Sequence, residues 1–353
     1  MNLPDSPMKP PDNKLTLPSL VLGTSGLGNL FVALEDSEKL HIVEESVKYA
    51  GGIPVFDTAG KYGAGLALES LGRSLRSLGV PPDQVIISNK LGWLRTRLQT
   101  SEPSFEPGVW KNLKHDAVQN ISYAGIMECF EQGNELLNGY VPQLVSVHDP
   151  DEYLAKATSP AEEYKLYNAI LEAYAALFEL KRQGKVQYIG IGAKNWKVIQ
   201  RISNDIKLDW IMIANSLTLK EHPLDLLNFV ADMAGKGVHL INSALFHSGF
   251  LVGSDYFDYR RISREEPEFS ALYNWRDAFF ECCKQFAVQP AEACVQFGLQ
   301  VNGIKSIALN TTNSKRVKQN AEMVSKQLPA AFWSALKEQR LIQINSEHFN
   351  LLP

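Results

Sequence analysis

Short apolar runs alternate with amphipathic helical patterns along almost the whole chain. The helical periodicity is clearest at 36–50 and 66–78, where apolar residues recur every three or four positions. The runs typical of buried strands are, in order, 19–23, 53–57, 85–90, 143–148, 186–190, 210–214, 238–243 and 305–309. Because helical segments join these strands, we expect the strands to run parallel.

Strand-helix units in series, with no shift in composition between them, predict a closed (β/α)8 TIM barrel within the 353 residues. A doubly wound sheet is the alternative, but it usually has fewer strands and a topological switch that the pattern does not show. We expect a single barrel domain at 15–353 and a flexible, Pro-rich arm at 1–14.

Two connections are much longer than the others, 91–119 after the third strand and 244–269 after the seventh. Structureless connections of that length are usually functional or disordered. The first is rich in aromatic residues, among them Trp93, Phe105 and Trp110, which favours a functional role.

Charge and cysteine content restrict the partners and the compartment. The net charge is -4 with Lys and Arg scattered, so nothing favours nucleic acid or an anionic membrane as a partner. No apolar run approaches the ~20 residues of a membrane span, and 1–14 lack the apolar segment of a signal peptide. Four cysteines, two of them adjacent, fit a reducing compartment. We therefore expect a cytoplasmic monomer or small homo-oligomer that acts on a small molecule.

Four polar residues lie at or just after the carboxyl ends of predicted strands. Asp57 ends the second strand, Tyr62 follows it in a glycine-rich loop, Lys90 ends the third strand and His148 ends the fourth. In a barrel these ends share one face, where ligands bind. Burying a lysine without a partner is costly, so Asp57 is the natural partner of Lys90.

Such a set could move a proton to or from a carbonyl or alcohol oxygen. Tyrosine has a pKa near 10, and bringing it towards neutrality takes roughly 3 to 4 kcal/mol. An ammonium about 4 Å away supplies on the order of 4 kcal/mol at an effective dielectric of about 20. We expect Lys90 to lower the pKa of Tyr62, Asp57 to hold Lys90, and His148 to donate to the same substrate oxygen. This site has no electron sink, so it requires a hydride carrier.

Other classes of reaction are not favoured, because the sequence lacks the residues that each of them requires. A glycosidase needs two facing carboxylates, and only one predicted strand ends on an acid. No metal site is expected, because His148 stands alone and the adjacent cysteines have no second pair. Gly190 and Gly192 begin a pattern like the dinucleotide-binding fingerprint, but its third glycine is missing.

The order Asp57, Tyr62, Lys90 and His148 on successive strands resembles the aldo-keto reductases, over about 20–321. The resemblance implies a (β/α)8 barrel that binds NAD or NADP at the carboxyl face, with Tyr62 as acid or base in hydride transfer. Within the family the chain looks most like the aldose 1-dehydrogenase group, which includes the L-fucose, L-galactose and D-threo-aldose dehydrogenases and the pyridoxal 4-dehydrogenases. The stretches that carry this likeness are 56–63, 147–151, 189–192 and 242–251.

The resemblance also implies a set of cofactor contacts. These are Gly23, Thr24, Asn195, Asn215, Ser243, Leu245, Asn310, Arg316 and Asn320. Three positions depart from the family pattern: Ala193-Lys194-Asn195 replaces the usual carboxamide clamp, Asn242 replaces a stacking tyrosine, and Asn310 replaces a lysine that often meets the 2'-phosphate of NADP. The last change tilts the prediction towards NAD.

Three residues are candidates for substrate contact, each with a structural alternative. Trp93 and Trp110 could stack on a sugar or pack their own loop, and Asp149 could bind sugar hydroxyls or cap the turn before Pro150. The leading hypothesis is oxidation of C1 of an aldose to its lactone. The alternatives are an aldehyde or ketone reductase, including one for pyridoxal-type substrates, and a non-catalytic nucleotide-binding regulatory subunit.

Overall fold

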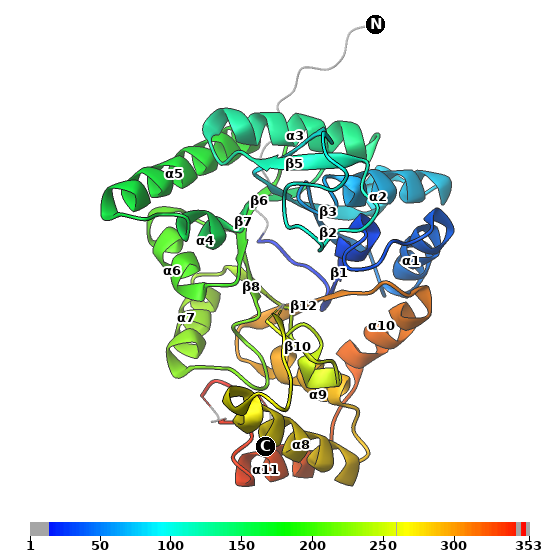
Figure 1. Ribbon diagram of the computed structural model, residues 1–353, viewed down its shortest axis with the longest axis vertical. Helices are drawn as coiled ribbons and strands as arrows, with labels where there is room; N and C mark the ends of the chain where they lie inside the picture. The colour runs from blue at the N-terminus through cyan, green and yellow to red at the C-terminus, as the bar shows by residue number, and fades with distance from the viewer. Residues whose placement is uncertain (1–13, 259, 344–346, 351–353) are drawn as a thin grey trace, which may run out of the picture.

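The computed structural model describes residues 14–258, 260–343 and 347–350, and its centre is a closed barrel of parallel strands (Figure 1). The barrel strands are β1 (Leu20–Gly23), β2 (Val55–Ala59), β3 (Ile86–Leu91), β6 (Leu144–His148), β7 (Tyr188–Ala193), β8 (Trp210–Ala214), β9 (His239–Ser243) and β12 (Ile304–Asn310). Around the ring the order is β1-β12-β9-β8-β7-β6-β3-β2, and the pairing of β1 with β2 closes it. The predicted TIM barrel is confirmed.

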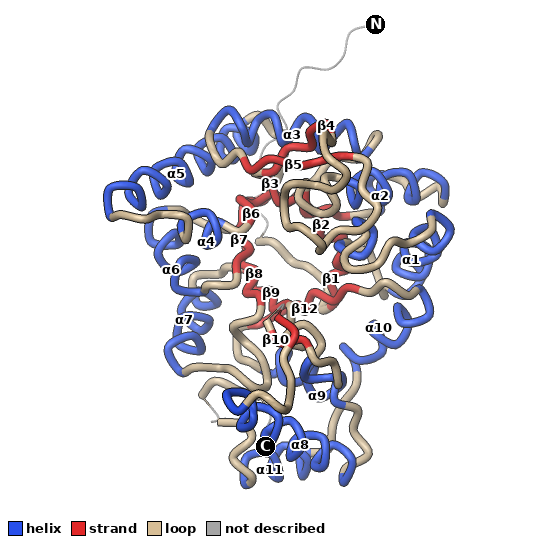
Figure 2. Tube along the Cα trace, in the orientation of Figure 1, coloured by secondary structure: helices blue, strands red, loops and turns tan. Residues whose placement is uncertain are grey.

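Helices cover the outside of the ring, as Figure 2 shows. The helices in the connections between barrel strands are α1 (Asp36–Tyr49), α2 (Leu66–Ser77), α3 (Tyr123–Leu137), α4 (Pro150–Leu154), α5 (Pro160–Arg182), α6 (Trp196–Asp205), α7 (Leu224–Gly235), α8 (Ser270–Gln285) and α9 (Pro290–Gln300), with α10 (Val317–Ser325) and α11 (Ala330–Glu338) after the last strand. Each helix that follows a strand brings the chain back to the amino end of the next one. None of the described helices is long and apolar enough to span a membrane.

The amino end of the barrel is filled by side chains. Leu15 and Leu17, just before β1, pack with Val21, Met212 and Trp210 in one buried cluster. Trp210 fits inside the ring because β7 has Gly190 beside it, where a Cβ would lie 2.1 Å from the indole. The barrel interior is therefore filled at this end, and the large cavity lies at the carboxyl end of the strands. The predicted arm at 1–14 lies, except for Lys14, outside the described residues.

The sequence pattern predicted a structureless connection after the third barrel strand. The structure instead has a hairpin there. β4 (Trp93–Arg97) pairs antiparallel with β5 (His115–Gln119) beside the mouth of the barrel. The connection after the seventh barrel strand likewise holds β10 (Tyr256–Phe257) and β11 (Arg260–Arg261). Both hairpins escaped prediction: β4 and β5 are separated by the long segment 98–114 rather than by a tight turn, and β10 and β11 have only two residues each.

Candidate active site

The structure brings together the four residues predicted at the barrel mouth. Asp57 and Lys90 lie on the neighbouring strands β2 and β3, and His148 is the last residue of β6. The Lys90 ammonium is 4.8 Å from the centre of the Tyr62 ring, and the rings of Tyr62 and His148 are 5.6 Å apart and nearly perpendicular. Asp57, Lys90 and His148 are each at most 4% exposed. A phenol, an ammonium, a carboxylate and an imidazole therefore face one small volume.

Asp57 fixes the charge and the direction of Lys90. Lys90 Nζ is 2.5 Å from Asp57 Oδ2 and also donates to the Thr58 carbonyl at 3.3 Å. Ser88 Oγ donates to the other carboxylate oxygen at 3.2 Å. Burial alone would lower the pKa of Lys90, but the Asp57 carboxylate and Tyr62 outweigh it and hold that pKa above its usual value. Lys90 is therefore a permanent cation beside the phenol.

The pKa of Tyr62 does not fall towards neutrality, contrary to the sequence expectation. Burial, the largest effect, raises the pKa of Tyr62 to about 12, while Lys90 acts in the opposite direction. The expected electrostatic effect of Lys90 is present, but the estimate from Coulomb attraction left out the cost of removing a phenolate from water. The phenol is consequently neutral at ordinary pH and suited to donating a proton.

His148 is a neutral imidazole. Burial, followed by the nearby ammonium groups of Lys61 and Lys90, lowers the pKa of His148 well below 6.5. Its Nε2 lies 3.4 Å from Asp149 Oδ2, and its Nδ1 has no hydrogen-bond partner among the described residues. A carboxylate oxygen near Nε2 favours the tautomer with hydrogen on that atom. His148 can therefore donate a hydrogen bond into the pocket without carrying charge.

Close backbone contacts fix the position of Tyr62. A Cβ on Gly63, whose φ is +63°, would lie 2.3 Å from the carbonyl oxygen of Gly28. A Cβ on Gly28 would in turn lie 2.7 Å from the carbonyl carbon of Tyr62. Only glycine permits this approach of the loops after β1 and β2. On the other side, the Trp110 ring is 5.9 Å from the Tyr62 ring.

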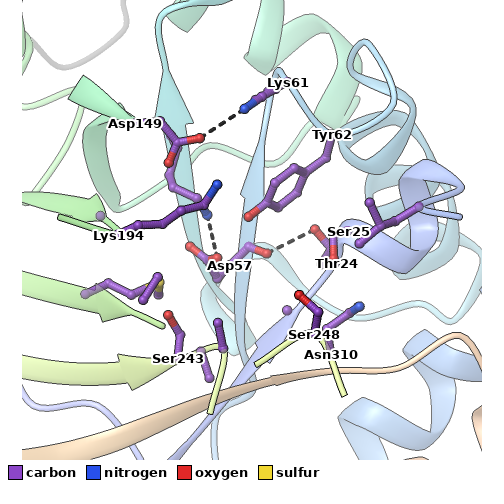
Figure 3. Close-up of a pocket in the computed structure, with 18 of the residues that line it drawn as sticks. Thr24, Ser25, Asp57, Lys61, Tyr62, Asp149, Lys194, Ser243, Ser248 and Asn310 are labelled. Atoms are coloured by element: carbon purple, nitrogen blue, oxygen red, sulfur yellow. Dashed lines mark hydrogen bonds and ion pairs between the residues drawn. The ribbon is translucent and has the colours of Figure 1, made fainter. Parts of the chain in front are cut away.

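The four residues open into a cavity of about 620 Å³, the size range of small-molecule sites. Figure 3 shows Tyr62 with its hydroxyl pointing into this space, Asp57 below it, and Thr24, Ser243 and Asn310 further along. Apolar side chains such as Leu245 and Leu309 cover part of the same wall. The cavity thus combines a proton-transfer end with a longer, mixed polar and apolar end.

The predicted cofactor residues divide into two groups. The lining of the cavity includes Gly23, Thr24, Ser243, Leu245 and Asn310, and Gly26 N donates to Asn310 Oδ1 at 3.1 Å. Among the described residues that line it, Asn195, Asn215, Arg316 and Asn320 do not appear.

Local contacts explain the orientation of the Asn195 and Asn215 side chains. The Asn195 side chain accepts from Lys197 N and caps α6, so its amide oxygen already has a partner in this arrangement. The Asn215 amide donates to Asp258 Oδ1 at 2.6 Å.

The predicted substrate residues also divide. Trp110 and Asp149 line the cavity. Trp93 does not appear in that lining within the described part of the chain; its ring packs 5.8 Å from Phe105, and the Lys61 ammonium lies 5.3 Å from it. For Trp93 the structure thus gives the packing role that the sequence left open.

Sequence reasoning missed Lys61, Glu106 and Asp258, all of which line the cavity. Two sequence features could have pointed to Lys61. It directly precedes Tyr62, and later connections at the same end of the barrel contain the acidic residues Glu106, Asp149 and Glu152. Spacing alone could not show that these four side chains meet, because they come from three different connections.

The cavity fits a nicotinamide cofactor in its chemistry. Hydroxyl and amide side chains (Thr24, Ser243, Asn310) line it together with apolar ones, and Gly23 and Gly192 add backbone without side chains to the wall. A cofactor held there would reach the proton-transfer residues, because Asp57, Tyr62 and Lys90 line the same cavity.

The mouth of this TIM barrel holds a tyrosine, a lysine-carboxylate pair and a neutral histidine. This combination defines an oxidoreductase that acts on a carbonyl or alcohol group and relies on a cofactor to carry the hydride. The sequence matches the aldo/keto reductase family over residues 19–340. The chain belongs to this family, and it is an NAD(P)-dependent oxidoreductase acting on CH-OH or carbonyl groups.

Known relatives agree with the group that the sequence suggested. D-threo-aldose 1-dehydrogenase of Pseudomonas sp is 28% identical over 342 residues, covering 93% of this chain and 95% of the relative. Pyridoxal 4-dehydrogenase of Microbacterium luteolum is 27% identical with the same coverage. L-galactose dehydrogenase of Arabidopsis thaliana is 21% identical, covering 88% of this chain and 85% of its own.

Solved structures share the fold. The aldo-keto reductase AKR11C1 from Bacillus halodurans superposes with a TM-score of 0.66 at 20% identity, covering 94% of both chains. The glycerol dehydrogenase AKR11B4 from Gluconobacter oxydans has the same TM-score at 17% identity, covering 96% of this chain and 97% of its own.

Proposed function

We propose that this protein oxidises C1 of an aldose of the L-fucose, L-galactose or D-threo-aldose type to the lactone. The observation that carries the proposal is the wall beside Tyr62, where the Trp110 ring and the carboxylates of Glu106 and Asp149 line one cavity. An aromatic face with hydrogen-bond acceptors around it suits a polyhydroxylated ring. Two of the relatives are named for action on sugars, D-threo-aldose and L-galactose.

Each polar residue has a part in this reaction. Tyr62 exchanges a proton with the oxygen on the reacting carbon, and neutral His148 donates from Nε2 to that oxygen. Lys90 opposes the effect of burial on the phenol, and Asp57 keeps Lys90 charged and in place. The nicotinamide cofactor supplies the hydride acceptor or donor. Thr24, Ser243, Leu245 and Asn310 would hold it along the cavity.

Reduction of an aldehyde or ketone is the second candidate, and one observation favours it. A tyrosine with a pKa of about 12 is nearly all protonated near neutral pH, which is the form needed to donate to a carbonyl oxygen. Pyridoxal-type aldehydes belong to this candidate, since one relative is a pyridoxal 4-dehydrogenase.

A preference for NAD over NADP forms part of the proposal. Asn310 brings no positive charge to the position where the 2'-phosphate is expected, although Lys315 and Arg316 are close in sequence. Asn310→Lys should move the ratio of kcat/KM values towards NADP by about tenfold, since one charge-assisted contact is worth about 1.5 kcal/mol or more. An unchanged ratio would remove Asn310 from the cofactor preference.

The compartment and assembly are proposals as well. Cys129, Cys282, Cys283 and Cys294 are all free and buried, which suits a reducing cytoplasm. We propose a monomer or small homo-oligomer that works without nucleic acid or membrane.

A spectrophotometric screen tests the function. Purified protein is mixed with fucose, galactose, arabinose or pyridoxal and either oxidised cofactor, and with small aldehydes and either reduced cofactor. The proposal expects cofactor reduction with at least one aldose, and a loss of about a hundred- to ten-thousandfold in kcat for Tyr62→Phe. Turnover of aldehydes alone would select the reductase, and turnover unaffected by Tyr62→Phe would exclude both assignments of Tyr62.

A further inference from the structure

A buried lysine next to Tyr62 ties together three connections at the mouth of the barrel. Lys61 is 4% exposed, and its ammonium lies 2.8 Å from Glu106 Oε1, 3.1 Å from Asp149 Oδ2 and 3.1 Å from Glu152 Oε2. Glu106 belongs to the segment between β4 and β5, Asp149 follows β6, and Glu152 lies in α4. The Lys61 cluster is the name used below for Lys61, Glu106, Asp149 and Glu152.

The charges of this cluster keep Lys61 ionised. Burial alone would lower the pKa of Lys61, but Asp149, Glu106 and Glu152 outweigh it and raise that pKa above its usual value. Removing an ammonium from water costs several kcal/mol, and only close carboxylates with good geometry offset that cost. Such an arrangement fixes the carboxylates as firmly as it fixes the lysine. Lys61 thus determines where the carboxylate of Asp149 lies.

Asp149 lies at the point where this cluster meets the reaction site. Its Oδ2 is 3.1 Å from Lys61 Nζ and 3.4 Å from His148 Nε2, and its side chain lines the cavity. Figure 3 shows Lys61 and Asp149 facing each other, with Tyr62 beside them. The backbone of Asp149, at the N-terminus of α4, has a φ of +47°, a conformation uncommon for residues other than glycine.

The distance between His148 Nε2 and Asp149 Oδ2 suits two oxygens on adjacent carbons. His148 donates a hydrogen to the reacting oxygen, and Asp149 can only accept one. The Asp149 carboxylate, an acceptor beside the His148 donor, matches a hydroxyl group on the carbon next to the reacting one. Such a hydroxyl can donate to Asp149 at about 2.8 Å while His148 holds the reacting oxygen. A hydrogen or methyl group there would leave the carboxylate without this partner.

We propose that Asp149, positioned by Lys61, is a specificity-determining residue that accepts a hydrogen bond from the hydroxyl group adjacent to the reacting carbon. The substrate class is therefore the α-hydroxy aldehydes and their cyclic aldose forms. The inference rests on the proposed oxidoreductase function and assigns one contact within it. Asp149 touches the substrate, whereas Lys61 acts through Asp149 and is a positioning residue.

A pair of aldehydes that differ only in this hydroxyl group tests the proposal. Lactaldehyde carries it and propionaldehyde does not. The wild-type protein with reduced cofactor should favour lactaldehyde about ten- to a hundredfold in kcat/KM, the range for a hydrogen bond to a charged group. Asp149→Asn keeps the shape and tolerates the positive φ, and it should reduce this preference. Asp149→Gly also tolerates that φ and should abolish the preference.

Variants of Lys61 separate positioning from folding. Lys61→Met should lose most of the preference for lactaldehyde over propionaldehyde, and Lys61→Arg should restore part of that preference. Lys48→Met is the matched control, because it removes an exposed lysine paired with Glu45 at 2.9 Å. Melting temperatures identify any variant that fails to fold, and Asp149→Asn then decides the result.

The outcomes distinguish this inference from the proposed function. Turnover of both aldehydes with the same preference in wild-type protein and Asp149→Gly would overturn the inference and leave the oxidoreductase function intact. An equal loss for both aldehydes in Lys61→Met, without rescue by arginine, would overturn the positioning role. Absence of turnover for every aldehyde and aldose would overturn the proposed function and the inference together.

Discussion

The ammonium of Lys90 lies 2.5 Å from the carboxylate of Asp57, and both side chains are 5% exposed. This pair joins neighbouring strands of the barrel, β2 and β3, directly under the reacting phenol. It therefore serves both the stability of the fold and the electrostatics of the site.

Asp57→Asn should destabilise the protein by about 3–5 kcal/mol, because it leaves the buried Lys90 ammonium without its counter-charge. Urea unfolding measures the change in free energy. Glu45→Gln, which breaks an exposed pair with Lys48, should cost less than about 1 kcal/mol. The double variant Asp57→Asn/Lys90→Met should be more stable than Asp57→Asn alone. If the two single carboxylate variants unfold at the same urea concentration, the pair does not have the stabilising role described here.

Oxidation and reduction should respond oppositely to pH. The Tyr62 pKa is about 12. While the pH stays below that value, each increase of one pH unit raises the fraction of phenolate about tenfold. The kcat for oxidation should therefore increase from about pH 6 to about pH 9, while the kcat for reduction stays level or falls. Stopped-flow rates at saturating substrate would measure both. A plateau of the oxidation rate beginning near neutral pH would show that the phenol is more acidic than this structure indicates.

Gly63→Ala should reduce activity more than stability alone explains. The added Cβ would lie 2.3 Å from the Gly28 carbonyl oxygen, so the loop that carries Tyr62 must move. A shift of about 1 Å at a catalytic group can cost on the order of a hundredfold in rate. The measurements are kcat and the unfolding free energy. Gly52→Ala is the control, because a Cβ there meets nothing within 4 Å, and it should leave kcat unchanged.

A buried histidine at the amino end of the barrel should weaken the fold in acid. Burial, partly offset by the backbone of Leu15, lowers the pKa of His239 to about 4. Above its usual pKa of 6.5 the ring is neutral in both folded and unfolded chains. As the pH falls from 6.5 to about 4, only the unfolded chain takes up the proton, so the free energy of unfolding decreases by up to about 3 kcal/mol.

His239→Gln tests this prediction, because glutamine can still hydrogen-bond Ser306, which lies 2.9 Å from His239 Nε2. Urea unfolding at pH 7 and at about pH 4.5 gives the comparison. The variant should lose less stability between the two pH values than the wild-type protein. Equal losses in both proteins would assign the acid sensitivity to other groups, such as His148.

The barrel could be predicted because most of its strands are buried on both faces and therefore appear as continuous apolar runs. β7 shows the limit of that pattern: it was expected at 186–190 but spans Tyr188–Ala193. Glycine has a low strand propensity, so the run through Gly190 and Gly192 looked like the end of a strand. In the fold Gly190 leaves room for the Trp210 ring, whereas a Cβ on Gly192 would make only an ordinary contact with Lys90 at 3.6 Å.

The proton-transfer residues could be predicted because they lie at the carboxyl ends of barrel strands or directly after them, whereas Trp110 was found from the aromatic content of its connection. Asp57, Lys90 and His148 were found because the topology places strand ends together. The Lys61 cluster was not found, because Glu106 lies in a connection whose path the sequence does not determine. The pKa of Tyr62 was misjudged for a related reason, since the degree of burial depends on the loops that cover it.

The segment between β4 and β5 is fastened to the loop after β1. Phe31 N donates to the Val109 carbonyl at 2.9 Å, Lys111 N donates to the Asn29 carbonyl at 3.0 Å, and Leu30 pairs with Trp110 as an isolated bridge. The reaction chemistry belongs to the barrel itself, whereas this one insertion supplies an aromatic face and an acid over it. Exchanging this insertion between members of the family is therefore a route to a different substrate preference that leaves the residues of proton and hydride transfer unchanged. The loop after β1, which contacts the insertion, must be exchanged together with it.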